Sequence, residues 1–186
     1  RVERGLSPHT LLAYENDARK LAAFAGARGV DVLALRQGEL AEYIGWLREG
    51  SKIPVVVKGL LSPEDAEMAI QNGAQAIVVS NHGGRQLDGA PATLSVLPEI
   101  AKAVAGRVPV LMDGGIRRGI DMVKAIALGA DAVLVGRAPL WGLGAFGQEG
   151  VERVLWMLGA EFKLAMALAG ATSVAELRKL KVKVAL

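Results

Sequence analysis

The segment SNHGGRQLDGAPAT (residues 80–93) begins at the end of an apolar run and is rich in glycine and ionisable residues. Within it, His82 and Arg85 lie three positions apart. An imidazole can accept a proton near neutral pH, and a guanidinium can bind a carboxylate through two parallel hydrogen bonds. The pair suits a substrate whose carboxylate lies next to the bond that is broken, with His82 as the base and Arg85 as the anchor. For the other histidine, His9, we expect a structural role.

Three further apolar runs end in residues of the same kind. IPVVVKG ends in Lys58 and Gly59, VPVLMDGG ends in Asp113–Gly115, and AVLVG ends in Gly136, which Arg137 follows. In parallel α/β folds, ligands bind at the carboxyl ends of the strands. Four consecutive predicted strand ends therefore offer a cation, a glycine-rich turn or both to a common site.

Two of these turns suit a phosphate group. DGGIRRG offers backbone N–H groups and a helix N-terminus, and VGRAP adds a second glycine turn with Arg137. The alternative is that each glycine pair only forms a turn that needs a positive φ. Lys58 also has two interpretations: a lysine whose stem lies along the sheet edge, or a cation beside a group that gains electrons, such as a reduced flavin ring.

Residues 1–50 have the pattern of helices. Ser7 is a plausible N-cap, with Pro8 at the first helical position, and apolar residues then recur every three or four positions as far as Phe24. A second helix is predicted from Gln37 to Arg48. No strand pattern appears in this segment, so it differs in kind from the rest of the chain.

From Ile53 onward, four short valine-rich runs alternate with helical patterns. Such runs are typical of parallel strands that are buried on both faces, and their spacing is that of βα units. Ser62 and Pro63 mark the start of the first of these helices. The sequence therefore predicts an α/β protein, either a doubly wound sheet or part of a barrel, followed by a helical tail.

Composition excludes several classes of protein. The 186 residues contain no cysteine, and no second histidine lies near His82, so neither a disulfide framework nor a metal site is predicted. No apolar run approaches the roughly 20 residues that span a bilayer, and we expect a cytoplasmic protein. Residues 1–50 carry seven basic and seven acidic side chains, so the net charge of +3 lies entirely in the remainder.

Residues 52–186 resemble the C-terminal half of the FMN-dependent α-hydroxy-acid dehydrogenases and oxidases, the family of glycolate oxidase, L-lactate dehydrogenase and mandelate dehydrogenase. The resemblance is carried by SNHGGRQLDGAPAT, by VVVKGLLSPEDA and by VPVLMDGGIRRGIDMVKAIALGADAVLVGRAPLWGL. It implies an FMN-binding half of a TIM (β/α)8 barrel over residues 51–186, with strands that correspond to the last four βα units.

The resemblance also implies a role for each site residue. His82 would be the catalytic base and Arg85 the substrate anchor. Lys58 would stabilise the negative charge of reduced FMN, and Ser80 would hydrogen-bond the flavin. The remaining cofactor-binding residues would hold the ribityl-phosphate end, and they are Asp113, Gly114, Gly115, Ile116, Arg117, Gly136 and Arg137.

Residues 1–50 resemble something else, the start of the N-terminal core-binding (SAM-like) domain of tyrosine recombinases, shortened to about two helices. We therefore expect a domain boundary at Gly50–Ser51. Zero net charge in this segment argues against strong affinity for DNA, because binding to the phosphate backbone depends on lysine and arginine.

The expected function is FMN-dependent oxidation of an L-2-hydroxy acid to the 2-oxo acid, impaired if half of the barrel is missing. The alternatives are a DNA-binding helical module of a recombinase and an inactive chimeric product. A half barrel exposes two sheet edges and an apolar face, which predicts a homo-oligomer.

Overall fold

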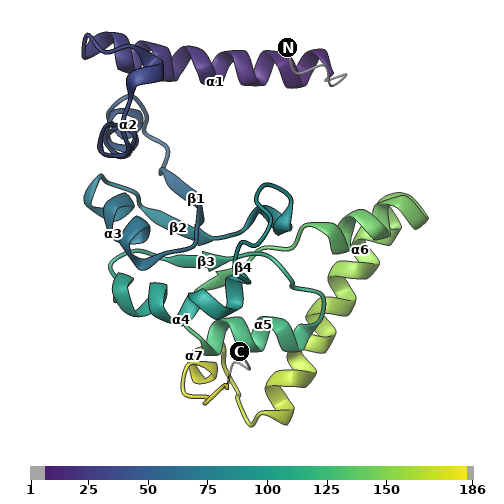
Figure 1. Ribbon diagram of the computed structural model, residues 1–186. Coiled ribbons are helices and arrows are strands. Elements are labelled where there is room, and N and C mark those ends of the chain that lie inside the picture. Colours follow the sequence, from purple (N-terminus) through teal and green to yellow (C-terminus); the bar gives the residue numbers. More distant parts are fainter. Residues whose placement is uncertain (1–6, 184–186) are drawn as a thin grey trace. The chain divides into compact units, whose positions relative to one another are not determined.

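The computed structural model describes residues 7–183, and the chain forms two compact units, Arg1–Ile53 and Pro54–Leu186 (Figure 1). The division falls three residues after the predicted boundary at Gly50–Ser51. Each unit is described by itself. None of the described helices is long and apolar enough to cross a membrane.

The first unit contains two α-helices, α1 (Pro8–Ala27) and α2 (Gln37–Glu49), with a short 3-10 turn, η1 (Val32–Ala34), between them. The predicted helix start is confirmed, because the Ser7 side chain accepts a hydrogen bond from the Thr10 N–H and Pro8 is the first helical residue. Both predicted helices are therefore present, and α2 ends one residue later than expected.

The core of the first unit is an aromatic cluster. Phe24 of α1 is fully buried and lies against Tyr43 and Trp46 of α2, with ring centroids 5.1 and 6.0 Å away. The apolar stripe of α1 continues away from this cluster, but there Leu11 and Tyr14 are 54% and 62% exposed. Only the C-terminal end of the predicted apolar face is covered within this unit.

The second unit is built on a parallel sheet of four strands in the order β1-β2-β3-β4. The strands are β1 (Val56–Leu60), β2 (Ala76–Val79), β3 (Val110–Met112) and β4 (Ala132–Val133). The connecting helices are α3 (Pro63–Gln71), α4 (Thr93–Val104) and α5 (Gly119–Ala127), and all three lie on the same face of the sheet (Figure 1). Sequential order with helices on one face favours a barrel wall, since a doubly wound sheet reverses its order and carries helices on both faces.

Burial differs between the inner and outer strands. Ile77, Val79 and Met112 of the two inner strands are almost completely buried. The prediction that every strand is buried on both faces is wrong for β1 and β4: Val56 is 48% exposed, and β4 has no buried residue. The physical reason is position, because within the described residues an outer strand of this sheet has a neighbour on one side only.

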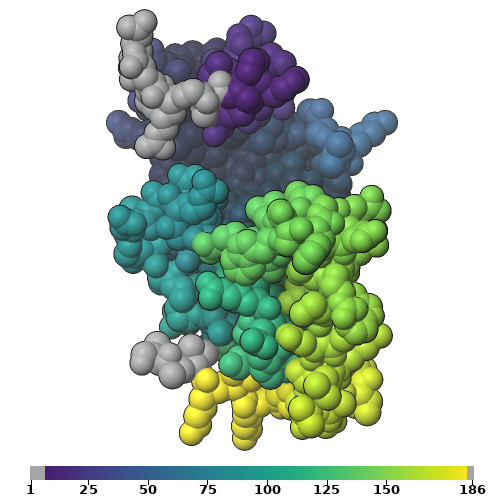
Figure 2. Space-filling view, turned by 90° about the vertical axis from the view of Figure 1, so that its right-hand side faces the viewer, coloured from purple at the N-terminus to yellow at the C-terminus, as the bar shows by residue number. Residues whose placement is uncertain are grey.

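The C-terminal part of the second unit is dominated by α6 (Arg137–Leu168), which α7 (Val174–Leu177) follows. Phe146 and Gly147 interrupt α6 with non-helical backbone angles, so it consists of two helical arms. The arms form a continuous ridge along one side of the unit, coloured green to yellow in Figure 2. Several large apolar side chains of α6 are more than half exposed, namely Leu140, Trp141, Leu143, Phe146, Trp156, Leu164 and Leu168.

An ion pair on the outer helical layer makes this unit sensitive to acid. Arg107 donates hydrogen bonds to both carboxylate oxygens of Glu67 on α3. These bonds, and a further one from Gln71, lower the pKa of Glu67 from 4.5 to about 2. A carboxylate with a lowered pKa stabilises the fold above its unfolded pKa, and that contribution is lost as the pH falls through the folded value.

We therefore expect the Glu67→Gln variant to lose less stability than the parent protein between pH 4.5 and pH 2. The measurement is urea unfolding at a series of pH values in that window, with both proteins in the same buffers. Equal loss of stability in the two proteins would contradict the assignment.

Candidate active site

A polar cluster connects three strands at one edge of the sheet. The ammonium of Lys58, which lies inside β1 because the strand continues to Leu60, is 2.8 Å from the Asp113 carboxylate after β3 and donates a 2.9 Å hydrogen bond to Ser80 Oγ after β2. Ser80 is completely buried, and its Oγ also accepts the backbone N–H of His82 at 3.1 Å. The structure thus brings together four predicted site residues from three segments of the sequence, since Ser80 and His82 belong to the same loop.

The backbone of the His82 loop is unusual. The predicted loop contains a 3-10 turn, η2 (His82–Gly84), in which all three residues have positive φ, 55° at His82. Asn81 stabilises this turn by accepting the Gly83 N–H at 3.1 Å. The imidazole packs on the backbone of Gly59, where an added Cβ would lie 2.7 Å from His82 Cε1. The loop conformation therefore places the ring against the end of β1, next to the Lys58 cluster.

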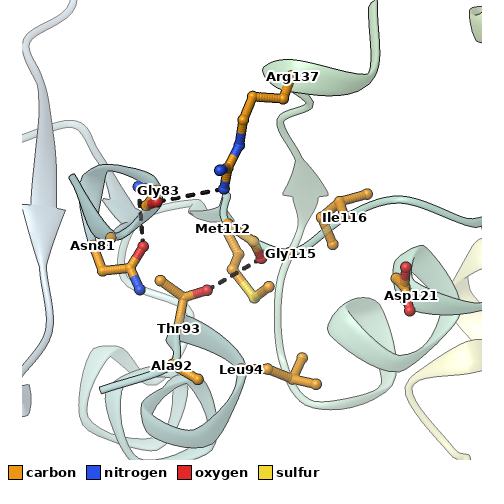
Figure 3. Close-up of a pocket in the computed structure, with 12 residues that line it drawn as sticks. Asn81, Gly83, Ala92, Thr93, Leu94, Met112, Gly115, Ile116, Asp121 and Arg137 are labelled. Carbon is orange, nitrogen blue, oxygen red and sulfur yellow. Dashed lines mark hydrogen bonds between the residues drawn. The ribbon is translucent and has the colours of Figure 1, made fainter. Parts of the chain in front are cut away.

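A pocket of about 280 Å³ lies at the same edge of the sheet, between the loops that follow β2 and β3 (Figure 3). Gly114, Gly115 and Ile116 line the pocket from the loop after β3, together with Asn81 and Gly83 from the loop after β2 and Thr93 from α4. Arg137, the first residue of α6, also lines it and donates a long 3.4 Å hydrogen bond to the Gly83 carbonyl. A guanidinium above two glycine turns is an arrangement suited to an anion such as a phosphate.

The helix N-terminus after DGGIRRG has fewer open backbone N–H groups than the sequence suggests. Acidic side chains accept three of the N–H groups of this segment. The carboxylate of Asp121 accepts the N–H groups of Arg117 and Arg118, and Glu161 of α6 accepts the N–H of Gly119. Arg117 can therefore contribute its exposed side chain but not its backbone amide, and its cofactor-binding role stays a prediction.

Two other predicted residues lie at the margin of this site. Arg85 follows η2 with an exposed side chain and does not line the pocket. Gly136 is the N-cap of α6, and an added Cβ there would meet no atom within 4 Å. Their roles as substrate anchor and cofactor contact stay predictions.

Among the pocket-lining residues that sequence reasoning missed, three have polar side chains, Asn81, Thr93 and Asp121. Asn81 stands directly before His82, and an asparagine in a glycine-rich segment is itself a turn signal, so it could have been found. Thr93 and Asp121 are ordinary first-turn helix residues in the sequence. Only the contact of Thr93, with the loop after β3, joins distant segments.

The geometry fits the FMN group that the sequence resemblance implies. One oxygen of Asp113, Oδ1, is buried without a hydrogen-bond partner, and a ribityl hydroxyl is a donor of the kind it lacks. The pocket volume is just below the roughly 300–1,000 Å³ of pockets that enclose a drug-sized ligand, so it suits one end of a nucleotide. Gly115 lines this pocket and leaves its backbone open to a ligand, because an added Cβ there would meet no atom within 4 Å.

Comparison with known proteins points to one family. Residues 3–184 match the family model of the FMN-dependent dehydrogenases. The chain is 53% identical to 2-hydroxyacid oxidase 1 of Homo sapiens over 142 residues, which are 76% of this chain and 38% of that protein. It is 55% identical to an L-lactate oxidase of Nostoc sp. over 132 residues, 71% of this chain and 36% of that protein.

Solved structures point to the same family. A crystal structure of mandelate oxidase with benzoyl-formic acid matches with a TM-score of 0.75 and 52% identity, over 77% of this chain and 43% of that one. The relatives are TIM-barrel proteins, and this chain spans between a third and two fifths of the length of the curated ones. The family match includes most of residues 1–50, and the comparisons give the recombinase resemblance no support. The chain therefore belongs to the FMN-dependent dehydrogenase family, whose cofactor is FMN.

Proposed function

We propose that the second unit binds FMN at the carboxyl edge of its sheet and acts in the oxidation of an L-2-hydroxy acid to the 2-oxo acid. The observation that carries this proposal is that the Lys58 cluster, the His82 loop and the pocket below Arg137 meet at one edge. The relatives named 2-hydroxyacid oxidase, L-lactate oxidase and mandelate oxidase support a substrate of this class.

The proposed roles follow from the contacts of each side chain. When bound, FMN would supply the oxidant, taking up the two electrons that leave the substrate together with one proton. His82 would take up the other proton, and the Arg85 guanidinium would hold the substrate carboxylate. Lys58, fixed by Asp113 and Ser80, keeps a positive charge beside the site. The pocket glycines and Arg137 hold the phosphate end.

We infer further that the second unit corresponds to half of a TIM barrel. Its four strands follow one another in sequence order, and the helices lie on one face, as in a barrel wall. In a complete barrel, the other half also contributes residues that contact the substrate and the flavin, and these are not among the described residues. Catalytic turnover by this chain is therefore a stricter test of the proposed function than FMN binding. Self-association of the open edges stays a prediction.

The proposal is tested by purifying the protein with added FMN and recording its flavin absorbance before and after anaerobic addition of L-lactate, glycolate or mandelate. We expect the protein to retain flavin, and the flavin absorbance to fall when one of these acids reduces it. If flavin is retained but no 2-hydroxy acid lowers its absorbance, the proposed oxidation is rejected. If no flavin is retained, the whole proposal is rejected.

Arg137→Ala is expected to weaken FMN binding about tenfold to a hundredfold, the loss that corresponds to a hydrogen bond with a charged partner. The measurement is a titration of flavin fluorescence. Arg153→Ala is the matched control, because Arg153 lies on the same helix but stacks over Trp156 outside the pocket. Equal dissociation constants for the two variants would exclude Arg137 from the phosphate site.

A further inference from the structure

Thr93 lies buried in the first turn of α4, and its hydroxyl reaches the loop after the neighbouring strand. The residue is 3% exposed. Its Oγ1 donates a 2.7 Å hydrogen bond to the carbonyl of Asp113 and lies 3.4 Å from the carbonyl of Gly114. Since a hydroxyl has one proton to donate, the shorter contact with Asp113 is the principal bond.

The same side chain sets the space around Gly114. An added Cβ on Gly114 would lie 3.0 Å from Thr93 Oγ1 and 3.3 Å from Asn81 Oδ1, so both side chains pack closely against the backbone here. Asn81 in turn accepts the Gly83 N–H and donates to the Pro91 carbonyl at 3.2 Å. Figure 3 shows the side chains of Asn81 and Thr93 next to each other at the pocket.

What Thr93 holds in place is the part of the loop that carries the flavin-binding groups. The Asp113 carboxylate pairs with Lys58 on one side, and its unpartnered Oδ1 is the acceptor that fits a ribityl hydroxyl. Gly114–Ile116 form the pocket wall. A shift of the Asp113 carbonyl would therefore displace both the carboxylate and the wall, because they belong to consecutive residues.

We propose that Thr93 is a positioning residue, whose hydroxyl fixes the Asp113–Gly114 turn in the conformation that binds the flavin. The inference rests on the proposed function where it concerns FMN, but the effect on the turn is independent of any ligand. Removing the hydroxyl leaves the Asp113 carbonyl without this donor, and the turn relaxes to find another partner, such as water.

The test compares Thr93→Val, which keeps the shape but loses the donor, with Thr93→Ser, which keeps the donor. We expect FMN to bind about tenfold more weakly to the valine variant, as for the loss of one good hydrogen bond, and within about twofold of the parent to the serine variant. Ser95→Ala is the control, because Ser95 donates to Ala92 in the same helical turn and does not reach the loop. Thr93→Ala replaces Thr93→Val if the latter does not fold.

A second measurement needs no flavin. Hydrogen exchange of the backbone amides of residues 114–116 is expected to be faster in the valine variant than in the serine variant and the parent. If the parent binds FMN and the valine and serine variants behave alike in either measurement, the inference is overturned. If the parent binds no FMN, the proposed function fails, and equal exchange rates in the two variants overturn the inference about the turn.

Discussion

His82→Ala is expected to slow the reduction of bound FMN by an L-2-hydroxy acid by about 10²–10⁴-fold, the usual contribution of a general base. FMN affinity should change by less than about twofold, because the backbone N–H of His82, which alanine retains, makes the bond to Ser80. The measurement is anaerobic rapid mixing with flavin absorbance as the signal, together with a fluorescence titration of FMN.

The control is His9→Ala, since His9 lies in α1 of the first unit. A second variant, His82→Asn, guards against a backbone effect. His82 has a φ of 55°, and asparagine adopts this left-handed region more readily than alanine does. If either His82 variant reduced flavin at the parental rate, the imidazole would not be the base.

Gly119→Ala is expected to destabilise the second unit by about 3 kcal/mol, at the upper end of the usual cost of overpacking. An added Cβ on Gly119 would lie 2.1 Å from the backbone nitrogen of Phe162 and 2.2 Å from the carbonyl carbon of Glu161. Backbone atoms cannot rotate away as a side chain can, so α5 and α6 must separate. The hydrogen bond from the Gly119 N–H to Glu161 would be lost with them.

Urea unfolding measures this effect in a Trp46→Phe background, in which the tryptophan fluorescence comes from Trp141 and Trp156 of the second unit. Gly159→Ala is the matched control. Gly159 lies in α6, the helix against which Gly119 packs, and an added Cβ at Gly159 would meet no atom within 4 Å. Alanine in that helix interior should stabilise the unit by about 0.5–1 kcal/mol. Equal unfolding midpoints for the two variants would show that the helices have room to adjust.

Local signals in the sequence were sufficient for most of the fold. Ser7 and Ser62 each cap the helix predicted to follow, and the four valine-rich runs are the four strands. These features depend on residues within a few positions of one another. The convergence of Lys58, Ser80 and Asp113 also followed, because parallel strands that are adjacent in order end at one edge.

Most of the features that the sequence did not reveal depend on contacts between distant segments. At the start of α5, the Gly119 N–H is accepted by Glu161, which is 42 residues away, while Asp121 caps the preceding N–H groups locally. Helix α6 begins at Arg137, although Gly142, Gly144 and Gly147 weaken any helical pattern before residue 150. Gly142 and Gly150 allow the two arms of α6 to touch. The spacing of apolar residues along the sequence does not reveal this contact.

The left-handed backbone at His82 also restricts which amino acids can replace histidine at this position during evolution. A codon change to asparagine removes the imidazole but keeps a residue that accepts this conformation, whereas valine or isoleucine would strain the loop. Lineages that have abandoned the chemistry but retained the fold should therefore carry asparagine, aspartate or glycine at this position.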